Sequence, residues 1–177
     1  MNINQWKNMT LDSIHNDFFI IQKVVYEPQR WVCNNIQKEA ESAEYGACTF
    51  EMNNRRIALR VGKITPTKVG QFVTLWKRIG KGPIMPYDMS DSIDLFVVTV
   101  RSNNHFGQFV FPKSVLYAKG VVSKDGKGGK RAMRIYPAWD VTDNPQAKRT
   151  QAWQLNYFFE IKPDQPIASS ILEKLFI

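Results

Sequence analysis

The segment from Ser92 to Arg101 constrains the fold of this chain more than any other. A strand with one face in water alternates apolar and polar residues, whereas a strand covered on both faces is apolar almost throughout. The second pattern is found here, in Ile93, Leu95, Phe96, Val97, Val98 and Val100. We therefore predict a buried central strand and an α/β fold, a mixed central β-sheet flanked by helices.

Two hairpins are predicted at asparagine pairs. Asn53-Asn54 separates the runs 45–51 and 55–64, and Asn103-Asn104 separates the central strand from a partner at 105–111. Apolar residues alternate with others in the run 55–64, as they do in a strand with one buried face. An asparagine pair between two such runs is typical of a tight turn. Two shorter strands are expected at 121–123 and 132–136.

Apolar spacings of three and four residues predict several helices. A short helix is expected between Pro112 and Gly120, and the segment 29–44 is left open between a helix and a loop. The longer predicted helices are 11–26, which ends before Pro28, 65–80, a helix that begins at Asn144-Pro145 and contains Trp153, Tyr157 and Phe158, and a C-terminal helix around 171–176.

The predicted helix 65–80 suggests a binding site at its start. Thr65 would cap the helix and Pro66 would occupy its first position. Free backbone N–H groups would then lie close to Lys63, Lys68 and Thr67, which is a suitable arrangement for an anion. A capped helix with solvated lysines explains the same residues equally well.

Positive charge is concentrated in the middle of the chain. Residues 55–134 hold 16 Lys and Arg but only four Asp, a net of +12, while the whole chain has a net charge of +8. Such a field favours a polyanion, because binding to phosphates releases condensed counterions. The predicted nucleic-acid contacts are Lys63, Lys68, Lys77, Arg78, Lys81, Lys124, Lys127, Lys130, Arg131 and Arg134.

The glycine-rich stretch 124–130 is predicted to be a mobile tip that approaches a nucleic-acid groove or backbone, with Lys119 on its flank. A solvated loop is the alternative interpretation, and the spacing excludes a phosphate-binding P-loop. Aromatic residues also lie beside cations in this part of the sequence. Trp76 fits a core position, whereas Trp139 fits base stacking and packing about equally well.

Length and composition favour one domain, 1–177, in the cytoplasm. The sequence lacks both the ~20 consecutive apolar residues that span a membrane and a secretory leader. Cys33 and Cys48 have no CxxC spacing, and His15 and His105 are far apart in sequence. A structural metal is therefore not expected, and no cofactor is predicted.

Three long segments resemble a known protein family. They are YGACTFEMNNRRIALRVGKITPTKVGQFVTLWKR, DLFVVTVR and HFGQFVFPKSVLYAKGVVSKDGKGGKRAMRIYPAWD, within a likeness that runs from about Phe18 to Tyr157. The sequence is similar here to the MepB proteins of Gram-positive bacteria, which are often encoded beside a MarR-type repressor and a multidrug efflux pump. This resemblance implies a restriction-endonuclease-like fold with duplex DNA as the ligand.

Nucleases of that fold place an acid and a lysine two residues apart on one strand, so that both face a bound metal ion. Lys63 would fill the lysine position, but Val61 occupies the position of the acid and cannot ligate Mg²⁺. We therefore expect DNA binding without efficient cleavage. One alternative is a Mg²⁺- or Mn²⁺-dependent nuclease that uses Glu51 with Asp94. Another is a protein-interaction module that acts on a transcriptional regulator.

Overall fold

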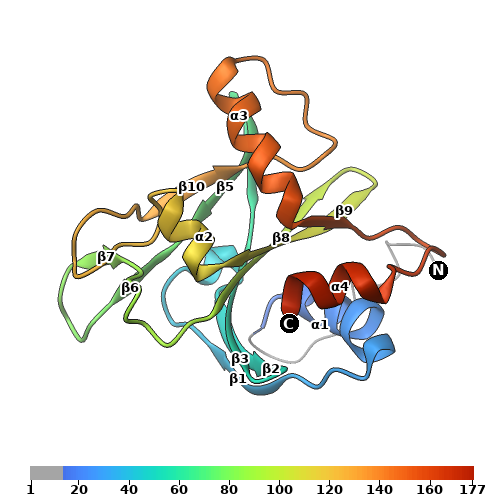
Figure 1. Ribbon diagram of the computed structural model, residues 1–177, viewed down its shortest axis with the longest axis horizontal. Coiled ribbons are helices and arrows are strands. Elements are labelled where there is room, and N and C mark those ends of the chain that lie inside the picture. The colour runs from blue at the N-terminus through green and yellow to red at the C-terminus, as the bar shows by residue number, and fades with distance from the viewer. Residues whose placement is uncertain (1–13) are drawn as a thin grey trace.

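The computed structural model describes residues 14–177 (Figure 1). The helices are α1 (Asn16–Ile21), continued by the π-helical turn η2 (Gln22–Tyr26) and the 3-10 turn η3 (Glu27–Gln29), then η4 (Ala43–Tyr45), α2 (Lys113–Ala118), α3 (Pro145–Gln154) with η5 (Leu155–Tyr157), and α4 (Ser169–Phe176). The strands are β1 (Asn34–Lys38), β2 (Cys48–Met52), β3 (Arg55–Val61), β4 (Lys63–Thr65), β5 (Lys68–Thr74), β6 (Trp76–Arg78), β7 (Ile84–Pro86), β8 (Leu95–Ser102), β9 (His105–Pro112), β10 (Ala132–Ile135) and β11 (Phe158–Glu160).

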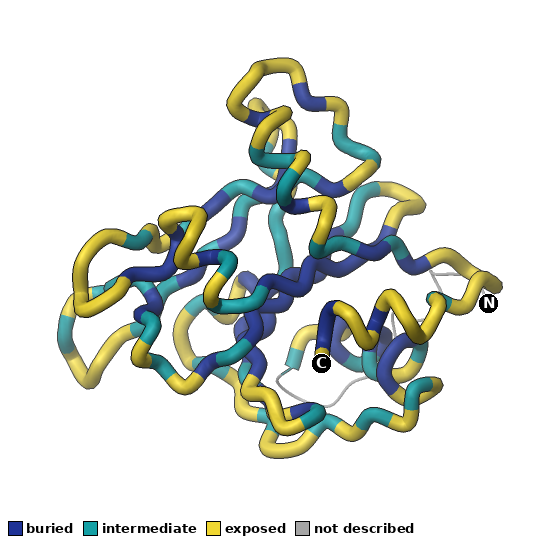
Figure 2. The backbone as a smooth tube through the Cα atoms, viewed as in Figure 1, coloured by how far each residue is buried: buried dark blue, intermediate teal, exposed yellow. Residues whose placement is uncertain are grey.

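A six-stranded sheet with the order β1-β2-β3-β8-β9-β11 forms the centre of the molecule. Only the β3–β8 pair within it is parallel, so the sheet is mixed. The predicted central strand is confirmed as β8, which is buried from Leu95 to Val100 (Figure 2). The α/β architecture with a mixed central sheet is therefore the one that the apolar run indicated.

Both predicted hairpins are confirmed. Met52 pairs with Arg55 across the β2–β3 turn, and Ser102 pairs with His105 across the β8–β9 turn. Asn53 and Asn54 adopt positive φ angles of 54° and 57°. Asparagine tolerates this left-handed backbone better than most residues do, so the sequence of the turn fits its shape.

The predicted helix 65–80 is wrong, because this region forms strands. Pro66-Thr67 is a two-residue turn between β4 and β5, in which Thr65 pairs with Lys68. β5 is then held by β10, since Gln71 pairs with Ile135 and Thr74 with Ala132, and the three strands form a sheet with the order β10-β5-β4. The apolar spacing of residues 65–80 fits a helix, but the segment contains β-branched residues, which favour strands. Its pairing with the distant β10 determines that it folds as a strand. The predicted anion site at a helix N-terminus is consequently not formed.

Other short elements also differ from the prediction. The segment 29–44, left open between a helix and a loop, contains the edge strand β1, which pairs irregularly with β2. β10 is confirmed, but the strand expected at 121–123 is wrong apart from a single bridge between Ser123 and Asp88. β1 could not be predicted as a strand because its residues are mostly polar, and an edge strand needs little apolar surface.

Most helix predictions are confirmed by α1, α2, α3 and α4, while residues 11–13 of the predicted helix 11–26 lie outside the described residues. Asn144 caps α3 by accepting a hydrogen bond from the Ala147 N–H at 2.8 Å, and Pro145 follows at the first helical position. Phe158 was expected in this helix but begins β11 and pairs with Phe109. Among residues 14–177, none of the helices has the length and apolar character needed to cross a membrane.

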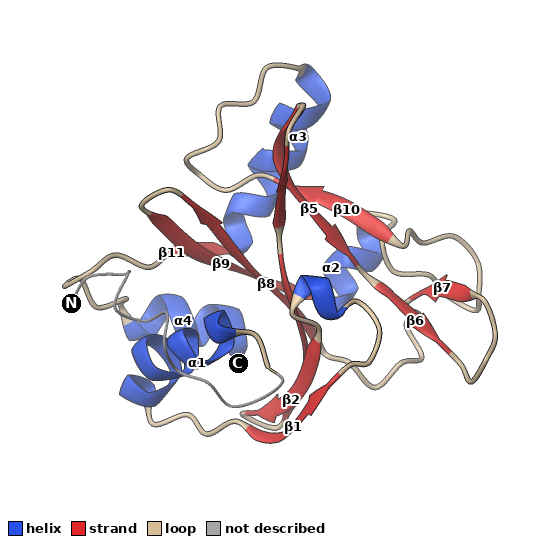
Figure 3. Cartoon of the chain, turned by 180° about the vertical axis from the view of Figure 1, so that it is seen from behind, coloured by secondary structure: helices blue, strands red, loops and turns tan. Residues whose placement is uncertain are grey.

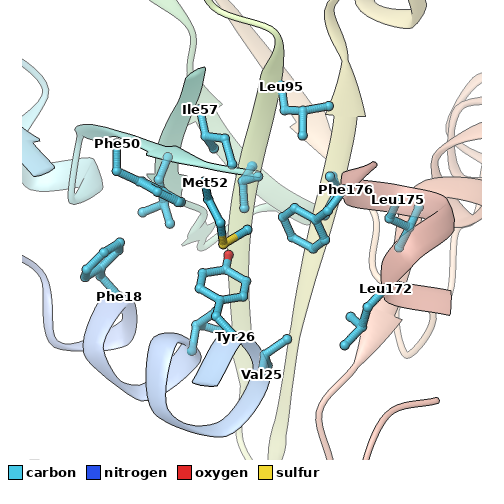
Figure 4. Close-up of a cluster of buried hydrophobic side chains, with 14 of the residues drawn as sticks. Phe18, Val25, Tyr26, Phe50, Met52, Ile57, Leu95, Leu172, Leu175 and Phe176 are labelled. Carbon is cyan, nitrogen blue, oxygen red and sulfur yellow. The ribbon is translucent and has the colours of Figure 1, made fainter. Parts of the chain in front are cut away.

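Each face of the central sheet is covered by a different set of elements. On one face α1, η2 and α4 pack with Phe18, Tyr26, Met52 and Phe176 in a buried cluster (Figure 4). On the other face β5, β10 and α2 contribute Val73, Ile135 and Leu116 to a second cluster. Figure 3 shows α3 beside β5 and β10, well separated from α1 and α4.

An ion pair between a buried arginine and a partly exposed glutamate fixes the chain between β1 and β2 to the second face of the sheet. Arg60, which is fully buried, donates two hydrogen bonds to the carboxylate of Glu39, at 3.0 and 2.8 Å. It also donates to the hydroxyl of Tyr87 at 3.1 Å and to the carbonyl of Leu59. Burial raises the pKa of Tyr87, so the phenol stays protonated beside the guanidinium. The pair thus holds three separate segments together.

Candidate functional site

A groove of about 560 Å³ runs between α3 and the β10-β5-β4 sheet. Its walls come from the start of β5, from the segment that follows α2, from β10 with Lys130 and Tyr136 on either side of it, and from α3 with the two residues before it. All of these elements lie on the face of the central sheet opposite to α1 and α4 (Figure 3). Segments that are far apart in sequence therefore meet at one hollow in the surface.

Four cations from three segments line this groove. They are Lys68 on β5, Lys119 after α2, Lys130 before β10 and Arg134 on β10. The side chains of the three lysines are exposed, and the lining contains one carboxylate, Asp143. The N-terminus of α3 opens onto the same hollow and adds its partial positive charge. The groove therefore has an excess of positive charge.

Arg134 has a structural role in addition to its charge. Its Nη1 donates to the hydroxyl of Thr65 and to the carbonyl of Gly70, both at 3.0 Å. Gly70 has a φ of +85°, and a Cβ atom there would lie 2.6 Å from the ring of Tyr136. Only glycine suits this backbone conformation at such close packing. Arg134 and Gly70 together fix the β4–β5 hairpin as one wall of the groove.

The groove also has an aromatic and apolar lining. Trp153 is half-buried and packs on Phe111 with a centroid distance of 5.5 Å. The Nζ atom of Lys119 lies 5.4 Å from the centre of the Trp153 ring, within the range of a cation–π contact. Val121 and Met133 are buried residues of the same lining. A hollow with this lining can hold a flat apolar group as well as an anion.

Three of the predicted contact residues are paired with acids elsewhere. Lys63 lies 2.8 Å from Glu44 and 4.5 Å from the centre of the Tyr45 ring. Lys77 pairs with Asp91, and Arg78 pairs with Glu41 at 2.8 Å. The acidic stretch before β2 therefore neutralises part of the basic middle. Neither Lys77 nor Arg78 lines the groove, because β6 leads away from it toward β7 (Figure 1).

The remaining predicted cations are exposed. Lys124, Lys127 and Arg131 belong to the tip, defined as residues 123–131, which leads into β10 beside the groove. Lys81 lies in the turn between β6 and β7. Figure 1 shows that this turn extends away from α3. Of the residues in the tip, Lys130 lines the groove, whereas Lys124, Lys127 and Arg131 do not, and neither does Lys81.

A buried carboxylate anchors the tip. Asp88 accepts hydrogen bonds from the hydroxyl of Ser123 at 2.7 Å and from the backbone N–H of Gly126 at 3.1 Å. Its other oxygen accepts from the N–H and the hydroxyl of Ser90. These bonds, with Ser123 the largest contributor, hold the pKa of Asp88 well below its usual range. The glycine-rich segment thus has a defined attachment that its composition alone did not reveal.

We expect Asp88→Asn to loosen the tip. The lowered pKa means that the carboxylate stabilises the folded tip above about pH 4, and that this contribution is lost as the pH falls through the folded-state pKa. Hydrogen exchange at Gly126 should therefore be faster in the variant than in the wild type at pH 7. Asp125→Asn, at an exposed neighbouring position, is the control and should leave the exchange rate unchanged. Equal rates in all three proteins would contradict this role for Asp88.

The residues considered for a degenerate nuclease site lie in two places, because Glu51 and Asp94 line one pocket together and Lys63 does not. Glu51 pairs with Arg56 across β2 and β3, and the Asp94 carboxylate accepts a hydrogen bond from the Arg56 N–H at 2.8 Å. Lys63 lies seven residues after Arg56 in the sequence. At about 3.3 Å per residue, the two are about 23 Å apart along β3 and β4. Val61 is at the same end as Lys63. The structure therefore does not bring Glu51 and Asp94 together with Lys63.

Within residues 14–177, no three His, Cys, Asp or Glu side chains are arranged to hold a metal ion. Burial raises the pKa of both the Cys33 and the Cys48 thiol to about 12. Both residues are therefore thiols at neutral pH, and a thiol is a poor nucleophile and metal ligand compared with a thiolate. The groove residues offer charge, an aromatic face and hydrogen bonds.

Sequence reasoning identified some groove residues and missed others. Lys68, Lys130 and Arg134 were predicted contacts, and Lys119 was noted on the flank of the tip. Trp153 was assigned only to a helix, although the Asn144-Pro145 start of that helix was visible in the sequence. Trp139, left open between stacking and packing, lies parallel to His105 at 4.8 Å and against Phe158. It belongs to the packed part of the molecule.

Comparison with known proteins gives two matches. A family model described as MepB-like matches residues 39–160, a range that includes every residue lining the groove. Among solved structures, the chain is similar to one described as the crystal structure of MepB, with a TM-score of 0.73 and 28% sequence identity. That match covers 85% of this chain and 100% of the other. The search of curated proteins finds no match.

Proposed function

The chain belongs to the MepB-like family, and from the groove that lies within the matched region we propose that it binds duplex DNA, mainly through phosphate contacts. The observation that supports this proposal best is the meeting of Lys68, Lys119, Lys130 and Arg134 at one groove. These residues come from three separate segments, with Lys130 and Arg134 on the same one, so their proximity is a product of the fold. The proposed contact surface consists of these four residues and the tip cations Lys124, Lys127 and Arg131.

Phosphate contacts explain the type of residue found at this surface. A lysine is a flexible point charge that can follow a phosphate, whereas an arginine fixed by other bonds presents its charge in one direction. Glycines in the tip allow the backbone to approach a strand closely. Contacts of this kind place a protein on a duplex but do not read its sequence. We therefore expect only weak sequence preference.

Binding should depend strongly on salt. If about six of the seven cations neutralise phosphates, the slope of log affinity against log salt concentration should be close to −5. The measurement is a fluorescence anisotropy titration of a labelled blunt duplex at several salt concentrations. A slope near zero, or no binding to the duplex at low salt, would refute the proposal.

A further inference from the structure

The groove contains an aromatic ring and buried apolar side chains, which phosphate contacts do not require. A convex basic surface is enough to follow a sugar-phosphate backbone, whereas a hollow of about 560 Å³ lies in the size range of pockets that enclose a small molecule. A base-paired duplex is far too wide to enter such a hollow. Proposed phosphate binding therefore explains the cations of the groove but does not explain Trp153, Val121 and Met133 in its lining.

The interior is suited to a flat ring. Trp153 is held by packing on Phe111, with the ring planes at 53° to each other, while part of the indole remains accessible in the groove. The buried side chains of Val121 and Met133 line the same hollow. An aromatic side chain fixed in this way can stack on any base, because every base has a π face.

Polar and charged side chains line the same groove as Trp153, Val121 and Met133. Gln146 and Thr150 lie on the groove side of α3 and can donate or accept hydrogen bonds at the edge of a base. Lys119 lies over the Trp153 ring, and Lys130 and Lys68 line the same groove. The Trp153 ring and the nearby cations together suit a nucleotide, which combines an aromatic base with a phosphate.

We propose that the groove receives one unpaired nucleotide of a DNA strand, with its base stacked near Trp153 and its phosphate beside Lys119 and Lys130. This inference rests on the proposed function and deepens it, because it names the form of DNA that the protein prefers. The tip cations are exposed and belong to the segment that supplies Lys130 to the groove, so they are available to other phosphates of the DNA. A duplex with a single-stranded overhang satisfies both parts of the surface.

The test compares three duplexes in the same titration: one blunt, one with a four-nucleotide thymidine overhang, and one with an abasic overhang of equal length. The two overhangs carry the same phosphates and differ only in their bases. We expect the thymidine overhang to bind about tenfold more tightly than the abasic one, as one stacked base would give. Equal affinities for the two overhangs would overturn the inference.

The blunt duplex separates this inference from the proposed function. Salt-dependent binding of the blunt duplex with equal affinities for the two overhangs would refute only the unpaired nucleotide. No binding of any of the three would refute duplex binding itself. Free thymidine monophosphate is added as a competitor. If it displaces the overhang duplex at concentrations equal to that duplex, the groove is a mononucleotide site and the strand proposal is wrong.

A variant that fills the groove gives an independent test. Thr150→Phe places a ring in the hollow from an α-helical position, whereas Ala152→Phe places the same ring at an exposed position outside the lining. We expect Thr150→Phe to abolish the tenfold advantage of the thymidine overhang. Ala152→Phe should retain the advantage. Retention of the advantage by a folded Thr150→Phe protein would contradict the proposed position of the base.

Discussion

Replacing Lys68, Lys119 and Lys130 together by alanine should weaken the binding of blunt duplex DNA about 500-fold at 0.1 M salt. Each lost phosphate contact lowers the magnitude of the salt slope by about 0.9, and three such losses give this factor at that salt concentration. All three side chains are exposed, so the substitutions should leave the fold intact. The measurement is a salt-resolved anisotropy titration, in which the slope should fall from about −5 to about −2.

The matched control removes the same amount of charge from another part of the molecule. Lys23, Lys162 and Lys174 are exposed and lie on η2, after β11 and on α4. Lys162 lines a small pocket with Val24 of η2, which places it on the α1 and α4 side of the sheet. The triple alanine variant of these lysines should bind within about threefold of the wild type. Equal losses for the two variants would show that net charge, and not the groove, determines binding.

Arg60→Ala should lower the free energy of unfolding by about 3–5 kcal/mol. Removing Arg60 leaves the partly exposed Glu39 carboxylate and the buried Tyr87 hydroxyl without their donor. The fully buried arginine also fills space that alanine would leave empty. Urea unfolding followed by tryptophan fluorescence measures this loss as a lower midpoint.

Two further variants separate the ion pair from other effects. Arg56→Ala removes an exposed arginine of the same strand, and we expect it to change the free energy of unfolding by no more than about 0.5 kcal/mol. Arg60→Met with Glu39→Met replaces both charges by apolar side chains and should recover most of the lost stability. If Arg60→Ala alone costs less than about 1 kcal/mol, the pair does not hold these segments together.

Parts of the fold that depend on neighbouring residues could be predicted from the sequence. The continuous apolar sequence of β8 is enough to predict that this strand is buried. The Asn53-Asn54 turn could be predicted because the strands on either side of it pair with each other. β5 could not be predicted in this way, because the strand that holds it, β10, lies about 60 residues further along the chain. Spacing alone cannot distinguish an isolated helix from a strand whose partner is so distant.

The same reasoning applies to the candidate site. Charge counting identified Lys68, Lys130 and Arg134, because the basic middle of the chain contains them. It could not separate them from Lys77 and Arg78, whose acidic partners approach only in the folded state. A lysine beside an aspartate in space has the same sequence signature as a solvated lysine. The resemblance to the MepB proteins identified the family, which a family model confirms.

The pairing of β5 with β10 also determines when the binding surface exists. The β2–β3 and β8–β9 hairpins need only local contacts, whereas the register of Gln71 with Ile135 closes a loop of more than 60 residues. Such long-range pairings form slowly, and small peripheral units can open without global unfolding. We expect the groove to be completed late on the folding pathway, after the central sheet. Heat or mild denaturant should therefore abolish the proposed DNA binding before the central sheet unfolds.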